Sequence, residues 1–170
     1  MTGFSLLLRG GLVADGTGAP LAARDVAVVG GRLAVLEPGS AVEAAEVVDV
    51  SGMVVAPGFI DAHTHSDTTA IDAANGVVEA EQAYAAVRQG VTVEIAGNCG
   101  SSAFPGAYSG LAALGRAHAA VGRANHLVSL VGHGSLRTAV VGAEARAASD
   151  GEIARMAELL DEALTAGAAG

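Results

Sequence analysis

From Met53 onward, short apolar runs alternate with stretches of helical spacing, and this alternation constrains the fold more than any other feature. The expected strands are residues 54–62, 91–96 and 126–131, and the expected helices cover roughly 77–88, 106–121 and 150–166. Short apolar strands that alternate with helices imply a parallel sheet covered on both faces. The sequence therefore predicts either a (β/α) barrel or an open doubly wound sheet.

The length of the chain limits how much of a barrel it can hold. An eight-stranded barrel takes about 250 residues, whereas this chain has 170 residues and about three strand–helix units. We therefore expect an α/β fold in two parts, both incomplete. Residues 1–55 are expected to form a small β-sandwich-like domain, and residues 56–170 the first part of a (β/α)8 TIM-like barrel, as in a truncated chain.

Before residue 55 the sequence favours short strands and tight turns. Strands are expected at residues 4–8, 12–13, 25–29, 32–36 and 47–50. Gly30-Gly31 joins two of them, and a Gly-Gly pair between β-rich runs predicts a tight hairpin, because both residues can take a positive φ. We expect these strands to form a small antiparallel sheet.

The final helix carries the clearest end signals in the chain. Ser149 and Glu152 have the spacing of a capping box, and apolar residues follow at helical intervals. Gly167 stands where a C-terminal glycine would end the helix.

Composition excludes several classes of partner. The net charge is −9, and all nine basic residues are Arg, which argues against binding to nucleic acid or to an anionic membrane. The start of the chain resembles neither a signal peptide nor a membrane span. A single cysteine, Cys99, excludes an intrachain disulfide, and we expect a cytoplasmic protein.

His63 and His65 close the first strand of the α/β part and are the strongest candidates for chemistry. Side chains two apart on a strand point to the same side. Both imidazoles can therefore converge at the carboxyl end of the strand, where neutral nitrogens can hold a divalent metal.

Other polar residues follow the same ends of the predicted strands. Because ligand sites in parallel α/β folds gather at the carboxyl ends of strands, we expect Asp67, Asn98, Cys99 and His133 to face the rim that carries the histidine pair. His118 in a helix and His126 at the start of a strand are assigned to structure.

Three of these rim residues have a plain structural alternative. Cys99 is either a metal ligand through its thiolate or a small buried residue. Asp67 either orients a ligand imidazole or caps the following segment. His133 either enters the pocket or hydrogen bonds to backbone in its loop. Asn98 is a candidate for the substrate pocket or for contacts around the metal ligands.

Three stretches of the chain resemble the amidohydrolase superfamily, and more closely its N-acyl-D-amino-acid deacylases. The first runs from Pro57 to Asp67 and contains the histidine pair, a pattern that many amidohydrolases share. The Gly97-Asn98-Cys99-Gly100 loop and the stretch from Leu130 to Arg137 are similar to the deacylase branch.

The resemblance implies a zinc hydrolase of non-peptide C–N bonds. It would act on a small-molecule N-acyl-D-amino acid and release a carboxylate and a D-amino acid. His63, His65 and Cys99 match the family's metal ligands. No catalytic residue is expected within the chain, because the family's general base would lie beyond Gly170. The oligomeric state is not specified by the sequence.

Two alternatives stay open at this point. One is a dihydroorotase- or hydantoinase-like cyclic amidase, against which Cys99 argues. The other is a truncated, non-catalytic fragment of an amidohydrolase, and for the 170 residues alone we expect no turnover.

Overall fold

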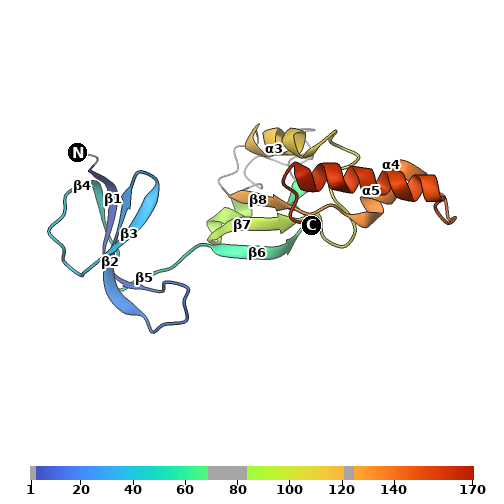
Figure 1. Ribbon diagram of the computed structural model, residues 1–170. Coiled ribbons are helices and arrows are strands. Elements are labelled where there is room, and N and C mark those ends of the chain that lie inside the picture. Colours follow the sequence, from blue (N-terminus) through green and yellow to red (C-terminus); the bar gives the residue numbers. More distant parts are fainter. Residues whose placement is uncertain (1–2, 69–83, 121–124) are drawn as a thin grey trace. The chain divides into compact units, whose positions relative to one another are not determined.

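The computed structural model describes residues 3–68, 84–120 and 125–170 (Figure 1). The chain divides into two compact units, Met1–Pro57 and Gly58–Gly170. Among the described residues, none of the helices has both the length and the apolar character needed to cross a membrane.

The first unit is one five-stranded sheet. Its strands are β1 (Phe4–Val13), β2 (Ala22–Val29), β3 (Arg32–Leu36), β4 (Ala44–Asp49) and β5 (Val54–Val55). The order is β3-β2-β1-β4, and β5 also pairs with β1. The β2–β3 hairpin confirms the prediction at Gly30-Gly31, whose φ angles are 56° and 73°.

Two predictions for this unit are wrong. The sheet is mixed rather than antiparallel, because β4 and β5 run parallel to β1. Residues 4–8 and 12–13 belong to one long strand with a shift in pairing between Leu8 and Gly11. The fully buried carboxylate of Asp25 supports this irregularity by accepting the N–H groups of Gly10 and Gly39, both at 2.9 Å. Only tertiary contacts could reveal either feature.

The second unit is built on three parallel strands in the order β6-β7-β8. Its elements are β6 (Phe59–Thr64), α2 (Ala85–Arg88), β7 (Val91–Ala96), α3 (Leu111–Ala120), β8 (His126–Ser129), α4 (His133–Val141) and α5 (Asp150–Thr165). Helix α3 lies alongside β8, and α4 and α5 lie next to each other near the carboxyl ends of the strands (Figure 1). The predicted parallel sheet is therefore confirmed.

Several bounds differ from the predictions. The run at 54–62 is split between β5 and β6, because Pro57 lacks the N–H that a continuous strand would use. No local pattern predicted α4, which starts at Gly132-His133-Gly134 without a side-chain cap. Of the predicted helix at 77–88, residues 77–83 lie outside the described residues. Phe59 and Ile60 on β6 are 67% and 64% exposed. At this strand the sheet is therefore not covered on both faces, contrary to the prediction from the sequence.

Helix α5 confirms the predicted end signals. The Ser149 hydroxyl accepts the N–H of Glu152, and the Glu152 carboxylate accepts the N–H of Ser149 at 2.8 Å. Gly167, with φ of 106°, follows the last turn. The Arg146 guanidinium also hydrogen bonds to Glu152 at 2.7 and 2.8 Å.

These contacts predict an acid-sensitive start to α5. Hydrogen bonds from Arg146, and then from Ser149, hold the pKa of Glu152 well below its ordinary value of 4.5. A lowered pKa contributes stability that is present above about pH 4.5 and is lost as the pH falls further. We expect Glu152→Gln to reduce helicity by circular dichroism at pH 7 in low salt, and the difference from wild type to shrink below pH 4.5. A difference independent of pH would contradict this, and Glu158→Gln, away from the cap, is the control.

Candidate metal centre

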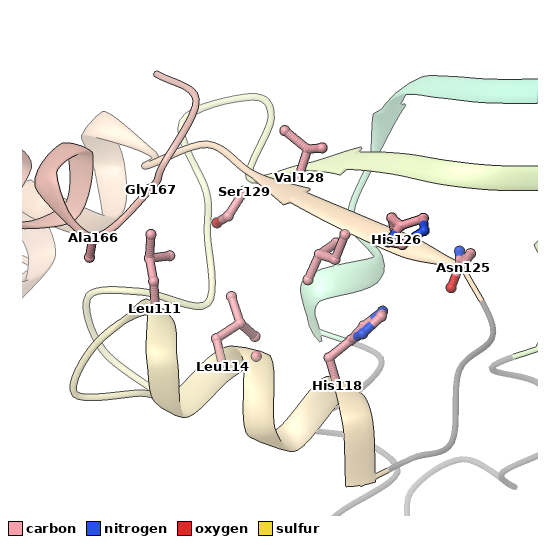
Figure 2. Close-up of a pocket in the computed structure, with 11 residues that line it drawn as sticks. Leu111, Leu114, His118, Asn125, His126, Val128, Ser129, Ala166 and Gly167 are labelled. Atoms are coloured by element: carbon pink, nitrogen blue, oxygen red, sulfur yellow. The ribbon is translucent and has the colours of Figure 1, made fainter. Parts of the chain in front are cut away.

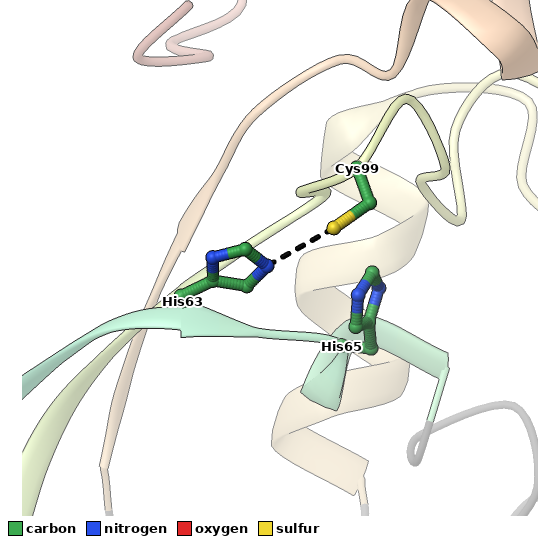
Figure 3. A group of neighbouring side chains, drawn as sticks. All are labelled: His63, His65 and Cys99. Atoms are coloured by element: carbon green, nitrogen blue, oxygen red, sulfur yellow. Dashed lines mark hydrogen bonds between the residues drawn. The ribbon is translucent and has the colours of Figure 1, made fainter.

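His63 and His65 lie where β6 ends. His63 is the second-last residue of the strand, and His65 follows its last residue, Thr64. The two rings are 6.0 Å apart between centroids and are inclined by 64° (Figure 3). Both imidazoles are exposed, so solvent and a cation can reach their nitrogens.

Cys99 reaches the histidines from the loop that follows β7. Its φ of 56° makes it the one non-glycine residue with a positive φ among those described. A residue other than glycine takes this conformation at an energetic cost, and such strain is concentrated at functional sites. Gly97 and Gly100, with φ of 88° and 78°, turn the chain tightly on either side. The thiol is thereby presented to the imidazoles, with Sγ 3.1 Å from Nε2 of His63 (Figure 3).

The three side chains fit a tetrahedral thiophilic cation. One ligand atom from each of His63, His65 and Cys99 lies within 4.8 Å of the others. Around zinc, ligand bonds of 2.0–2.3 Å place nitrogen and sulfur atoms about 3.3–3.6 Å from one another. Side-chain rotations that move the ligand atoms by less than about 1.5 Å would therefore bring all three to bonding distance of one ion. The fourth position would be left for water or substrate, as in catalytic zinc sites.

The loop that carries Cys99 packs directly on the loop that precedes α4. A Cβ atom on Gly132 would lie 2.5 Å from the carbonyl of Gly100 and 2.6 Å from the nitrogen of Ser101. The N–H of Gly132 donates to the Ser102 hydroxyl, and the Ser135 hydroxyl accepts the N–H of Ser102 at 2.8 Å. The sequence did not identify these serines, because their partners are backbone groups that no spacing rule shows.

Asp67 ties the segment after His65 to the segment after Cys99. Its carboxylate is fully buried, and Oδ2 accepts the N–H of Ala103 at 2.7 Å. Oδ1 has no hydrogen-bond partner among the described residues. The sequence predicted that Asp67 orients a ligand imidazole or caps the following segment. In the structure its carboxylate contacts Ala103, in the loop that follows β7.

We expect Asp67→Ala to lower the free energy of unfolding by about 1–2 kcal/mol, because it leaves the buried N–H of Ala103 without an acceptor. Asp67→Asn should lose less, since its amide oxygen can still accept that N–H. Urea unfolding of wild type, Asp67→Ala and Asp67→Asn checks this order of stabilities. Equal stability of wild type and Asp67→Ala would contradict it.

The remaining candidates fall at several places. Asn98 is half-buried beside Cys99 and hydrogen bonds to the backbone of β6 and β7. His133 is the exposed first residue of α4 and is not part of the group formed by His63, His65 and Cys99. His118 in α3 and His126 at the start of β8 lie in the elements predicted for them.

A cavity of about 350 Å³ lies between α3 and β8 (Figure 2). Leu111, Leu114 and His118 of α3 line one side of it, and Ser129 of β8 lines the other. None of the three candidate metal ligands lines this cavity.

Comparison with known proteins agrees with this architecture. The sequence profile of the Amidohydrolase family matches residues 46–170. D-aminoacylase from Alcaligenes xylosoxydans xylosoxydans is 39% identical over 189 residues, a match covering 98% of this chain and 37% of the relative. The chain belongs to the amidohydrolase family.

Solved structures of other amidohydrolases match the whole fold. A crystal structure of D-aminoacylase superposes with a TM-score of 0.85 at 36% identity, covering 98% of this chain. N-acyl-D-glutamate deacylase from Bordetella bronchiseptica, in complex with zinc and a phosphonate inhibitor, superposes with a TM-score of 0.83 at 33% identity, covering 99%. This amidohydrolase chain spans 38% of each of those chains and corresponds to their N-terminal part.

These matches confirm the family and the fold class expected from the sequence. The resemblance rested on the histidine pair, the Gly97–Gly100 loop and the stretch from Leu130, and the deacylase relatives cover all three. A dihydroorotase from Solibacter usitatus matches only 48% of the chain.

Proposed function

We propose that this chain is the metal-binding part of a zinc-dependent deacylase that hydrolyses N-acyl-D-amino acids. The observation that carries the proposal is the convergence of two imidazoles and one thiol at the carboxyl ends of parallel strands. The choice of substrate class is supported by three relatives whose matches cover almost all of this chain. They are D-aminoacylase, N-acyl-D-aspartate deacylase and N-acyl-D-glutamate deacylase.

His63, His65 and Cys99 would hold the zinc ion. Two neutral nitrogens and one thiolate suit Zn²⁺, whereas Mg²⁺ and Ca²⁺ prefer oxygen ligands. When bound, zinc polarises an acyl carbonyl and makes a water molecule acidic enough to attack it near neutral pH. The exposed ligands leave the substrate side of the centre open.

The proton acceptor for that water belongs to another part of the protein in our proposal. Among the described residues, no Asp or Glu joins the group of three ligands. We therefore expect the 170 residues by themselves to bind zinc without turnover, and catalysis to require a protein of the relatives' length.

The activity can be tested by joining this chain to the remaining part of the Alcaligenes D-aminoacylase. The zinc-loaded chimera should release amino acid from N-acetylated D-methionine, D-glutamate or D-aspartate and leave the L enantiomers intact. Dihydroorotate and hydantoins should not react. Hydrolysis of the cyclic amides instead, or no preference for the D enantiomer, would overturn the substrate class.

The zinc centre has its own test in the chain alone. Isothermal titration should show zinc binding to the 170 residues even if the chimera does not fold. Failure of the folded chain to bind zinc would overturn the metal centre itself.

A further inference from the structure

We propose that Asn98 is the positioning residue that sets the Cys99 thiol against the histidine pair. This inference rests on the proposed zinc centre and deepens it. It assigns to one side-chain amide the task of holding together two ligand segments that come from different strands.

The amide of Asn98 spans the two strands that carry the ligands. Its Nδ2 donates to the carbonyl of Ile95 in β7 at 2.8 Å and to the carbonyl of Thr64 in β6 at 3.3 Å. Thr64 is the residue between His63 and His65. The next residue along the chain from Asn98 is Cys99 itself, so the amide joins the segment with the two imidazoles to the segment with the thiol.

The backbone alone fixes this junction poorly. Pairing between β6 and β7 is irregular between Asp61 and Thr64, immediately where the first histidine lies. A disrupted ladder leaves neighbouring strand ends less well held. The second N–H of Asn98 supplies a cross-strand hydrogen bond at this place.

The loop after β7 needs such a contact because its backbone is unusual. Gly97, Cys99 and Gly100 all have positive φ, and glycines allow many conformations at little cost. Both N–H groups of one half-buried amide are used on backbone carbonyls, which fixes the orientation of the residue before Cys99. We infer that without this amide the thiol would sample positions away from the imidazoles.

Cobalt binding to the full 170-residue chain tests the proposal, because Co²⁺ bound to thiolate gives a charge-transfer absorption that reports sulfur ligation directly. Asn98→Ala should raise the Co²⁺ dissociation constant about 10- to 100-fold, the range found when residues that support metal ligands are changed, and should weaken the band. Asn98→Asp should do the same, because a carboxylate cannot donate to the two carbonyls. The Asn98→Asp variant also tests the proposal if the alanine variant does not fold.

Asn125→Ala is the matched control. The Asn125 amide also makes a buried hydrogen bond, to Glu94, but it lies beside the first residue of β8, at the opposite end of the sheet. This variant should keep the cobalt dissociation constant within about twofold and the full band, even where its thermal unfolding temperature falls. If the role of Asn98 were purely structural, the two alanine variants would show the same cobalt dissociation constant and the same band.

The outcomes separate this inference from the proposed function. A full band and an unchanged dissociation constant in folded Asn98→Ala or Asn98→Asp would overturn the role of Asn98 and leave the zinc centre standing. Absence of the band in the wild-type chain would overturn the centre, and the positioning role with it.

Discussion

Replacing Cys99 with alanine is expected to lower the zinc affinity of the chain by more than about 100-fold. Changes to residues that merely support a ligand already cost about 10- to 100-fold, and this change removes the one anionic ligand of the three. Two exposed imidazoles would then hold the ion alone. Isothermal titration of the metal-free chain at pH 7 measures the change.

His133→Ala is the control for this experiment. His133 is also an exposed imidazole that follows the carboxyl end of a strand, but it does not join the three-residue group. Its removal should leave the zinc dissociation constant within about twofold of wild type. An unchanged zinc dissociation constant in folded Cys99→Ala would mean that the sulfur of Cys99 is not a ligand.

Gly132→Ala is expected to destabilise the α/β unit by about 3 kcal/mol, at the upper end of what overpacking usually costs. The added methyl group would meet the backbone of Gly100 and Ser101, which lie 2.5–2.6 Å from the Cβ position. Backbone atoms cannot move aside as the end of a side chain can. The Cys99 loop would have to shift, so zinc affinity should fall as well.

Urea unfolding and zinc titration of the same variant check both effects. Gly151→Ala is the matched glycine control, because it lies in the first turn of α5 with nothing within 4 Å of its Cβ position. It should leave stability equal or raise it by up to about 1 kcal/mol, since alanine favours helix more than glycine does. Unchanged stability in Gly132→Ala would contradict the packing of the two loops.

Local sequence patterns predicted those parts of the fold that local physics decides. The bounds of β7, the Gly30-Gly31 turn and the capping box at Ser149 all follow from the period of apolar residues or from turn and cap chemistry. The parallel partners of β1 could not be predicted in this way, because nothing near β4 or β5 specifies which strand it joins. Helix α4 begins between two glycines, which disfavour helix, so its presence depends on packing.

The candidate site divides in the same way. Residues two apart at a strand end and a loop cysteine after the next strand predicted that His63, His65 and Cys99 share one rim. Sequence cannot give the positive φ of Cys99 or the contact of Asp67 with Ala103, because each arises from how the two loops fit together. Family resemblance, rather than spacing, pointed to zinc and to a deacylase.

The left-handed backbone at Cys99 decides which metal ligands could be engineered there. The φ of Cys99 lies in this region. Histidine, aspartate and asparagine enter it several times more readily than other residues with side chains, whereas a β-branched residue there is an outlier. A carboxylate could therefore be grafted in place of sulfur without rebuilding the turn. Such a redesign would shift the preference of the centre from soft toward hard cations and make it insensitive to oxidants.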